Sequence, residues 1–267
     1  MSRRRPMELA NGPEGVLFAP ADRRRREAVI VLHERYGLVR HTLDLARRLA
    51  RAGYAAFAPN LFAGWAGDAE ALKRGEARAA VSDSECAAIV GLAIDALRSD
   101  RGTRSDKIYL MGVCQSGRYP IVVASGRDDV AACAVFYGAA QQRDWDAGEL
   151  QPLAMPDMIA RLSAPSLFVF GEADHIISRD HVLRLRGALE SHRKSYRLRV
   201  IAGAPHGFLN DTMPGRYRAR EAKVAWDMLL AFLREVSKGK WPAGRVRWEF
   251  DCDSARAYDF SKNIRLE

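Results

Sequence analysis

The chain has 267 residues and is 48% hydrophobic, which is sufficient for one large α/β domain with a substantial buried core. Its formal net charge of +9 does not by itself indicate a nucleic-acid partner, because the basic residues are interspersed with acidic ones and form no recognisable binding module. No apolar run has the length of a signal peptide or a membrane span, and the four cysteines lack zinc-site or disulfide spacing, so we expect a cytoplasmic protein without a nucleic-acid, membrane, metal or cofactor partner.

The first expected elements follow two basic runs near the N-terminus. We expect residues 2–5 to form a mobile terminus and residues 23–26 to form a turn. Residues 29–32 are continuously apolar and β-branched, as in a strand buried on both faces. The amphipathic stretch 41–52 then predicts a helix that ends at a glycine, and residues 54–58 predict the next strand.

The middle of the chain continues this alternation. Two segments, 63–82 and 139–163, are expected to be irregular. The other predicted elements are strands at 108–111, 132–137, 166–170 and 196–201, and helices at 84–97, 115–125, 179–191 and 216–236. Repeated strand–helix alternation implies an α/β fold, with a mostly parallel central sheet covered by helices on both faces. We place this single domain in residues 1–240.

The C-terminal extension, residues 241–267, is rich in aromatic residues. It contains Trp241, Trp248, Phe250, Tyr258 and Phe260. A segment this aromatic is atypical of a disordered tail. We therefore expect it to pack on the domain or on a partner.

A candidate nucleophile lies in the stretch IYLMGVCQSG, residues 108–117. A predicted strand runs into Gly112-x-Cys114-x-Ser116 and then into a helix, which is the arrangement of a nucleophile elbow with cysteine at its centre. Small residues on both sides permit the sharp turn, and the N-terminus of the following helix favours a thiolate. A buried cysteine packed beside small residues is the structural alternative.

Two further motifs follow in the order acid, then histidine. Asp174 comes just after the predicted strand 166–170, with Glu172 and His175 as local competitors, and His206 lies in a loop after the predicted strand 196–201. The order nucleophile, acid, histidine is that of an α/β-hydrolase triad. In such a triad the histidine serves as general base and the carboxylate orients its ring.

From residue 29 to residue 236 the sequence resembles the dienelactone hydrolases, which belong to the α/β-hydrolases. The resemblance is carried by HERYG at 33–37, GYAAFAPNL at 53–61, the Cys114 elbow, FYG at 136–138, GEADH at 171–175 and PHGF at 205–208. It implies hydrolysis of a small ester or lactone through a thioester on the cysteine, without a cofactor or metal. A cysteine at the elbow separates this family from lipases and peptidases, which have serine there.

The resemblance also implies roles for individual residues. Glu34 matches a glutamate that contacts the resting thiol, although a surface carboxylate at a strand end is the alternative. The backbone N–H groups of Arg35 and Gln115 match the donors of the oxyanion hole. Tyr36, Trp65 and Tyr137 are candidates for contact with the substrate.

One departure from the family pattern concerns the substrate. Members that cleave dienelactone hold the substrate carboxylate with an arginine four residues after the triad histidine, and here that position is Asn210. Asn210 is thus a candidate binding residue, while the natural substrate stays open.

Two alternatives to ester or lactone hydrolysis follow. One is a different substrate such as a thioester, and the other is a non-catalytic ligand-binding member of the fold. A redox-sensing thiol would need a resolving cysteine, and Cys133 is a candidate for it only if it lies near Cys114 in space. We expect the protein to be a monomer or a small homo-oligomer.

Overall fold

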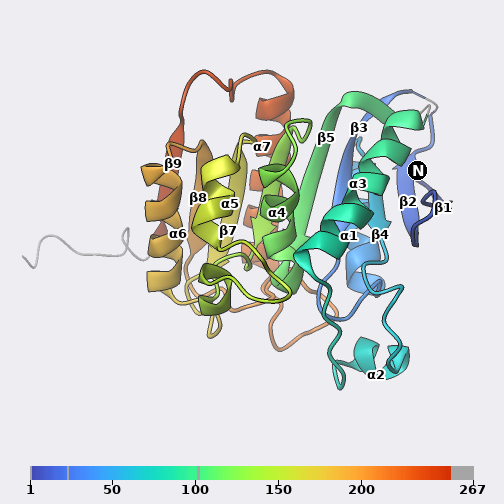
Figure 1. The fold of residues 1–267 in the computed structure, drawn as a ribbon, viewed down its shortest axis with the longest axis horizontal. Coiled ribbons are helices and arrows are strands. Elements are labelled where there is room, and N and C mark those ends of the chain that lie inside the picture. The colour runs from blue at the N-terminus through green and yellow to red at the C-terminus, as the bar shows by residue number, and fades with distance from the viewer. Residues whose placement is uncertain (1, 23, 101–102, 254–267) are drawn as a thin grey trace, which may run out of the picture.

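The computed structural model describes residues 2–22, 24–100 and 103–253, and the side chains of residues 103–106 are outside this description. Within these ranges, nine strands form one sheet in the spatial order β1-β2-β4-β3-β5-β6-β7-β8-β9 (Figure 1). The strands are β1 (Ser2–Glu8), β2 (Glu14–Pro20), β3 (Arg26–Leu32), β4 (Ala55–Pro59), β5 (Thr103–Val113), β6 (Ala132–Phe136), β7 (Ser166–Gly171), β8 (Tyr196–Ile201) and β9 (Trp248–Cys252).

The helices connect successive strands. They are α1 (Arg40–Arg51), α2 (Ala69–Arg74), α3 (Asp83–Ser99), α4 (Tyr119–Ser125), α5 (Met155–Arg161), α6 (Arg179–Ser191) and α7 (Ala219–Ser237), with 3₁₀ turns η1 (Cys114–Arg118) and η2 (Gln142–Trp145). No helix in the described ranges is both long enough and apolar enough to span a bilayer.

The sheet is mostly parallel, as the sequence predicts. From β4 through β3 to β9 every neighbouring pair is parallel, and only β1–β2 and β2–β4 are antiparallel. Helices α3, α4, α5 and α6 cover one face, while α1 and α7 cover the other. The predicted α/β fold with helices on both faces is therefore confirmed.

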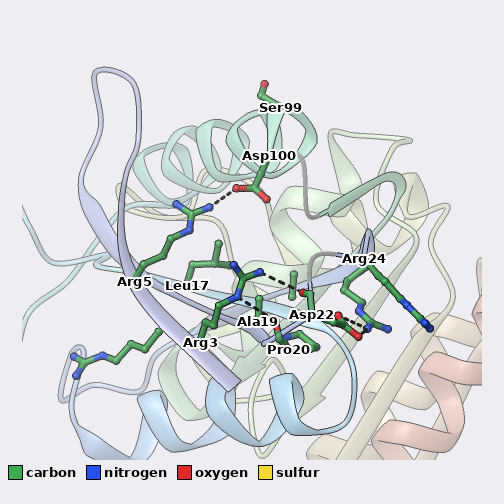
Figure 2. Close-up of a pocket in the computed structure, with 12 residues that line it drawn as sticks. Arg3, Arg5, Leu17, Ala19, Pro20, Asp22, Arg24, Ser99 and Asp100 are labelled. Carbon is green, nitrogen blue, oxygen red and sulfur yellow. Dashed lines mark hydrogen bonds and ion pairs between the residues drawn. The ribbon is translucent and has the colours of Figure 1, made fainter. Parts of the chain in front are cut away.

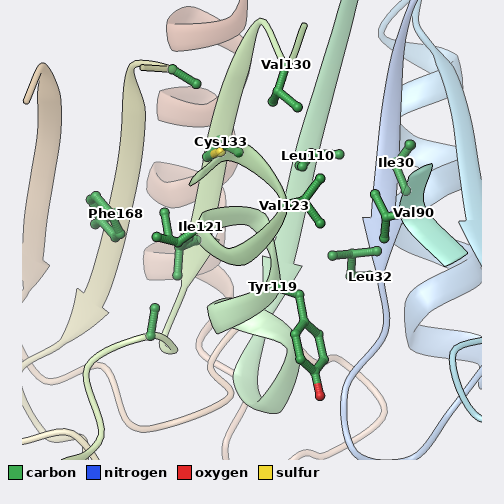
Figure 3. Close-up of a cluster of buried hydrophobic side chains, with 14 of the residues drawn as sticks. Ile30, Leu32, Val90, Leu110, Tyr119, Ile121, Val123, Val130, Cys133 and Phe168 are labelled. Carbon is green, nitrogen blue, oxygen red and sulfur yellow. The ribbon is translucent and has the colours of Figure 1, made fainter. Parts of the chain in front are cut away.

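The core lies on both sides of the parallel strands. Figure 3 shows part of the first layer, in which Val90 of α3 lies beside Ile30 and Leu32 of β3, and Ile121 of α4 faces Phe168 of β7. The second layer joins α1 and α7 to the opposite face of the same strands. Because β5 is buried on both faces, the end of this strand is held firmly, and Cys114 follows directly.

Both ends of the sheet differ from the sequence prediction. The expectation of a mobile terminus at residues 2–5 is wrong, because these residues belong to β1, which pairs antiparallel with β2. Strand β1 is largely charged, which suits an exposed edge strand. Because it contains no apolar run, hydrophobic pattern does not predict it. The prediction that 196–201 is the last strand is also wrong, since β9 follows and pairs with β8.

Strand β9 joins the sheet through charged side chains as well as backbone hydrogen bonds. Arg197 of β8 forms ion pairs with Glu235 at 3.0 Å and with Glu249, and Arg199 pairs with Asp251. Trp241 packs on Phe232 of α7 with a centroid distance of 5.1 Å. Of the aromatic residues expected to pack, Tyr258 and Phe260 lie outside the described residues.

Two segments expected to be irregular contain short helices. Helix α2 lies within 63–82 and is capped by Asp68, whose carboxylate accepts the N–H groups of Glu70 and Ala71. Helix α5 lies within 139–163. The last predicted helix begins at Ala219 rather than at residue 216. Short helices such as α2 and α5 depend on local capping and tertiary packing more than on hydrophobic periodicity. The exact first residue of a helix such as α7 depends on the same factors.

Candidate active site

Cys114 stands at a sharp turn between β5 and the 3₁₀ turn η1, and α4 follows η1. Its φ is +55°, a backbone conformation that residues other than glycine seldom adopt. Such strain persists only where the surrounding structure enforces it, and it is typical of a nucleophile elbow. The predicted elbow geometry is present, and Cys114 is partly exposed rather than buried.

Glycine is required at three positions around this turn. A Cβ on Gly112 would lie 2.4 Å from the carbonyl oxygen of Ser116. A Cβ on Gly117 would lie 2.6 Å from the Cα of Gly138, and one on Gly138 would lie 2.5 Å from the carbonyl oxygen of Cys114. The sequence motif identified Gly112, but only the fold brings Gly138, after β6, against the elbow.

Ser116 contributes a hydroxyl as well as small size. Its Oγ donates to the carbonyl oxygen of Leu32, at 2.8 Å, and accepts the N–H of Val113, at 3.1 Å. The hydroxyl therefore ties the elbow to the end of β3, where Glu34 and Arg35 begin the next loop.

The three residues predicted as a triad are in hydrogen-bond contact. His206 Nε2 lies 3.2 Å from Cys114 Sγ, and His206 Nδ1 lies 2.8 Å from Asp174 Oδ2. His206 and Asp174 are both buried. The order of these contacts allows His206 to exchange a proton with Cys114 while Asp174 orients the ring.

Asp174 is preferred over its two local competitors by burial and by hydrogen bonds. Its Oδ1 accepts the N–H groups of Ile176 at 2.8 Å and Ile177 at 2.9 Å, which fixes the carboxylate in the turn after β7. Glu172 is exposed and accepts the N–H of Gly203 at 3.2 Å, and the exposed His175 has its ring centroid 6.3 Å from that of His206.

The surroundings of His206 favour its protonated form. Burial by itself lowers the pKa of His206, but the hydrogen bonds to Asp174 and Cys114 and their negative charges outweigh it and raise this pKa to about 9. At neutral pH the site thus favours an imidazolium between Asp174 and Cys114, which is the protonation state that stabilises a thiolate.

Glu34 lies in a buried group of polar side chains next to the triad. Asn210 Nδ2 donates to Glu34 Oε2 at 2.9 Å, and the Tyr137 hydroxyl donates to Glu34 Oε1 at 3.3 Å. Burial raises the pKa of Glu34, although these hydrogen bonds and the charges of His206 and Arg216 oppose that shift. The Cys114 thiol is hydrogen-bonded to His206, and the contact of Glu34 with the resting thiol stays an expectation from the resemblance.

Asn210 and Tyr137 are placed firmly in this group. The Oδ1 of Asn210 accepts the backbone N–H of Thr212 at 3.0 Å and its hydroxyl at 2.6 Å, which leaves the amide nitrogen directed at Glu34. The Tyr137 ring meets the His206 ring edge-on at 5.2 Å between centroids. Tyr137 therefore connects Glu34 to the histidine, whereas Asn210, at the position of the family's arginine, donates to Glu34.

His33 is a structural residue of the loop that carries Glu34 and Arg35. Its Nε2 accepts the N–H of Leu61 at 3.0 Å, and its Nδ1 lies 2.8 Å from the Glu34 carbonyl oxygen. Burial lowers the pKa of His33 to about 4, so the ring is neutral and can fill both roles at once. It links the loop after β3 to the loop after β4.

The side chains of Arg35 and Gln115 hold one segment against the site. The Arg35 guanidinium donates to the carbonyl oxygens of Gly75, at 2.7 Å, and Ala77, at 3.4 Å, and the Gln115 amide donates to that of Ala79 at 3.0 Å. The resemblance implies a role only for the backbone N–H groups of these two residues, as donors of the oxyanion hole. The fold adds that their side chains anchor residues 75–79, between α2 and α3.

Tyr36 and Trp65 have different surroundings. Tyr36 is half-buried beneath Gly75, whose Cβ would be 2.8 Å from its ring, and the Arg35 guanidinium lies 5.3 Å from the ring centroid. Trp65 lines a cavity of about 420 Å³ with Leu61 and Val81. Within the described residues Trp65 forms no hydrogen bond or ring contact with Cys114, Asp174 or His206, so its substrate role stays a prediction from the sequence.

Arg216 is a residue near the site that the sequence analysis did not select. A Cβ built on Gly207, the residue after His206, would lie 3.6 Å from the Cδ of Arg216. The positive charge of Arg216 also acts to lower the pKa of Glu34. The residue belongs to no motif, and it follows His206 by ten positions in an irregular stretch. Only the folding of the loop brings its side chain back to the histidine.

Cys133 does not meet the requirement for a resolving cysteine. It pairs with Leu110, four residues before Cys114 along β5, which places it roughly 13 Å from the elbow. Its thiol is buried and donates to the carbonyl oxygen of Pro120 at 3.3 Å, and burial raises its pKa to about 12. In the ranges that the structure describes, no group of three or more His, Cys, Asp and Glu side chains forms a metal-binding arrangement.

Comparison with known proteins identifies one family. The model of the dienelactone hydrolase family matches residues 14–237. A Methylorubrum extorquens protein inferred to be a carboxymethylenebutenolidase is 28% identical over 221 residues, which cover 81% of this chain and 74% of that protein. A Bradyrhizobium protein inferred to be a 2-oxo-3-(5-oxofuran-2-ylidene)propanoate lactonase is 27% identical over 233 residues, 84% of this chain and 90% of its own.

Solved structures share the fold. A crystal structure of a Klebsiella pneumoniae protein inferred to be a dienelactone hydrolase superposes with a TM-score of 0.77 at 24% identity, covering 88% of this chain and 99% of that one. A dienelactone hydrolase-like promiscuous phosphotriesterase from metagenomic libraries has a TM-score of 0.70 at 18% identity, with coverage of 88% and 98%.

Proposed function

This chain belongs to the dienelactone hydrolase family, and on that premise we propose that it cleaves a small ester or lactone with Cys114 as the nucleophile. The observation that carries the proposal is the hydrogen-bonded series from Cys114 Sγ to His206 Nε2, at 3.2 Å, and from His206 Nδ1 to Asp174, at 2.8 Å. The names of two relatives denote lactone-cleaving enzymes, which supports a lactone as the substrate class.

In the first half of the proposed reaction, the Cys114 thiolate attacks the carbonyl carbon of the substrate. The carbonyl π electrons move to oxygen, and the backbone N–H groups of Arg35 and Gln115 donate to this oxyanion. When the intermediate collapses, the C–O bond breaks and the His206 imidazolium gives its proton to the departing alkoxide. The acyl group then remains on Cys114 as a thioester.

In the second half, water hydrolyses the thioester. Neutral His206 removes a proton from the water molecule, and the oxygen attacks the thioester carbonyl carbon. The C–S bond breaks, the carboxylic acid leaves, and the thiolate of Cys114 is restored beside the His206 imidazolium. Asp174 keeps the ring in one orientation during both proton transfers.

Glu34 is proposed to act as a positioning residue in this scheme. Its carboxyl group is held by Tyr137 and Asn210, and the Tyr137 ring packs against the ring of His206. A change at Glu34 would therefore reach the histidine through Tyr137. Its buried position supports this role over that of a surface carboxylate.

The test uses wild type, Cys114→Ala and Cys133→Ala with p-nitrophenyl acetate and an enol-lactone. We expect Cys114→Ala to lose roughly 10³-fold or more in kcat, since the covalent route is closed. Cys133→Ala, which removes a buried thiol elsewhere, should retain wild-type turnover. Acid quenching of wild type should trap an acyl group on the peptide that contains Cys114.

The same experiment separates the proposal from a non-catalytic ligand-binding protein. The proposed thiolate predicts rapid alkylation of Cys114 by iodoacetamide, because His206 favours its ionised form. A non-catalytic member predicts slow alkylation and no turnover of either substrate. Wild-type turnover in Cys114→Ala would refute the assignment of the nucleophile.

A further inference from the structure

A cavity of about 740 Å³ lies at the edge of the sheet, away from the triad (Figure 2). Its walls come from β1, β2, the connection between β2 and β3, and the end of α3. Arg26 begins β3 and Glu34 comes two residues after its end, so the cavity and the triad lie at opposite ends of this strand. A strand of seven residues separates such positions by roughly 20 Å.

The floor of the cavity is apolar. Leu17 and Ala55 at its base are almost fully buried, so the apolar surface open to a ligand comes from the half-buried Ala19 and Pro20. Leu17 and Ala55 face the α3 side of the sheet, where they join the core. Arg3 pairs with Ala19 and Arg5 with Leu17 in the β1–β2 register, and side chains of such cross-strand pairs share a face. Arg3 and Arg5 therefore lie on the same side as the apolar floor, as Figure 2 shows.

The lining carries an excess of positive charge. Among the described residues, five arginines line the cavity, namely Arg3, Arg4, Arg5, Arg24 and Arg26, and two carboxylates, those of Asp22 and Asp100. Because side chains alternate along β1, Arg4 points to the opposite face from Arg3 and Arg5. Without Arg4, the four other arginines and the two carboxylates give the described lining a formal charge of +2. The negative end of the α3 dipole, equivalent to about half a charge, is too small to offset this excess.

Internal ion pairs use only part of this charge. Arg26 pairs with Asp22 at 2.6 Å, and Arg5 pairs with Asp100. Arg3 donates instead to the carbonyl oxygens of Pro20, at 3.4 Å, and Asp22, at 3.3 Å, which holds its side chain across the cavity without neutralising it.

We propose that this cavity binds an organic phosphate, a small molecule with an apolar or aromatic body and several phosphate oxygens. The volume is within the range typical of small-molecule sites. The apolar floor suits the body of such a molecule, and the guanidinium groups, with planar sets of donors, suit its phosphate oxygens. This site is separate from ester or lactone cleavage and does not depend on the proposed function.

The proposal is tested by isothermal titration of the full chain with ATP, inorganic tripolyphosphate and adenosine at roughly 0.1 M salt, where diffuse charge effects are partly screened. We expect one saturable ATP site per chain, with ATP binding at least threefold more tightly than tripolyphosphate and adenosine at least tenfold more weakly than ATP. Equal affinity for ATP and tripolyphosphate would overturn the role of the apolar floor. Adenosine binding as tightly as ATP would overturn the role of the arginines.

Two double variants with the same charge change locate the site. Arg3→Ser/Arg24→Ser removes two arginines of the cavity, and Arg161→Ser/Arg220→Ser removes two exposed arginines on α5 and α7. We expect the first to weaken ATP binding at least tenfold and the second less than twofold. Equal weakening would mean attraction by net charge alone and would overturn the proposal.

Thermal unfolding of both double variants checks that the chain still folds. If replacement of Arg3 in β1 lowers the melting temperature, Arg24→Glu alone, in the connection before β3, provides the second variant. It should also weaken ATP binding at least tenfold. Unchanged ATP binding in Arg24→Glu would overturn the proposal.

Discussion

His206 Nε2 lies 3.2 Å from Cys114 Sγ, although the two residues are 92 positions apart in the chain. The contact depends on two separate strands of one sheet, because Cys114 follows β5 and His206 follows β8. Parallel strands end at the same edge of the sheet, which is where an α/β fold assembles its sites. Both partners are therefore placed by strand order rather than by proximity in sequence.

Replacement of Asp174 should weaken the proton exchange between His206 and Cys114. Asp174→Asn keeps the size of the side chain but removes the charge that holds the His206 ring, so we expect kcat to fall by roughly 10²- to 10⁴-fold. The pKa of His206 should fall as well, which an NMR titration of the imidazole would show. The control is Glu172→Gln, an exposed neighbour, which should retain activity. An Asp174→Asn enzyme with full activity would contradict the predicted role.

Stability should depend on pH through His206. Its pKa in the folded protein, about 9, is above the ordinary value of 6.5, so its proton stabilises the fold fully below pH 6.5, and this contribution is lost as the pH rises through about 9. At 1.36 kcal/mol per pKa unit the effect is at most about 3 kcal/mol. Urea unfolding of wild type and His206→Gln at several pH values measures it. A difference between the two proteins that does not shrink from pH 6 to pH 9.5 would refute this linkage.

The close packing of Gly138 against the elbow predicts a sharp contrast between two glycines. In Gly138→Ala the new Cβ would lie 2.5 Å from the Cys114 carbonyl oxygen, so the elbow must shift. We expect a loss of roughly 1–3 kcal/mol in the free energy of unfolding, together with most of the activity. Gly187→Ala, in α6 with no atom near the new Cβ, should instead gain up to about 1 kcal/mol. Chemical denaturation of both variants decides the comparison.

Because the side chains of Arg35 and Gln115 donate hydrogen bonds to residues 75–79, we expect these two side chains to keep that segment in one conformation. Gln115→Ala removes the hydrogen bond to the Ala79 carbonyl oxygen while keeping its own backbone N–H. We expect faster hydrogen exchange in residues 75–79 and a several-fold rise in KM with a smaller change in kcat, since the predicted oxyanion donors remain. Arg78→Ala, at an exposed position of the same segment, is the control. Unchanged exchange in Gln115→Ala would exclude this anchoring.

Arg216 should influence which substrates the site prefers. A positive charge near His206 and Glu34 attracts an anionic substrate, and Arg216→Gln removes it. We expect kcat/KM for a lactone that bears a carboxylate to fall roughly three- to tenfold, with little change for a neutral ester. Arg220→Gln, exposed on α7, serves as the matched control. An equal fall for both substrates would indicate a structural effect rather than charge recognition.

The sequence by itself was sufficient for the parallel core and for the choice of the three residues proposed as a triad, which the fold brings into hydrogen-bond contact. Buried strands such as β3 and β7 are short apolar runs, and Cys114 and Asp174 each follow such a run in a recognisable motif, whereas His206 follows β8, in which arginines alternate with apolar residues. Burial on both faces makes these strands visible in the sequence, because every position must then be apolar. The edge strands β1 and β9 escaped prediction because their charged residues face solvent or pair with other charges.

Only the tertiary structure decided which residues from different loops contact one another around Cys114 and His206. Asn210 contacts Glu34, Gly138 packs on the elbow, and Arg216 returns to the histidine, each from a loop that carries no periodic pattern. Likewise, the sequence shows the arginines of the N-terminus, but their meeting with Arg24 and Arg26 around a cavity depends on the pairing of β1 with β2. The physical reason is that local sequence determines which residues are buried, whereas contacts between loops depend on strand order and on the paths of the chain between the strands.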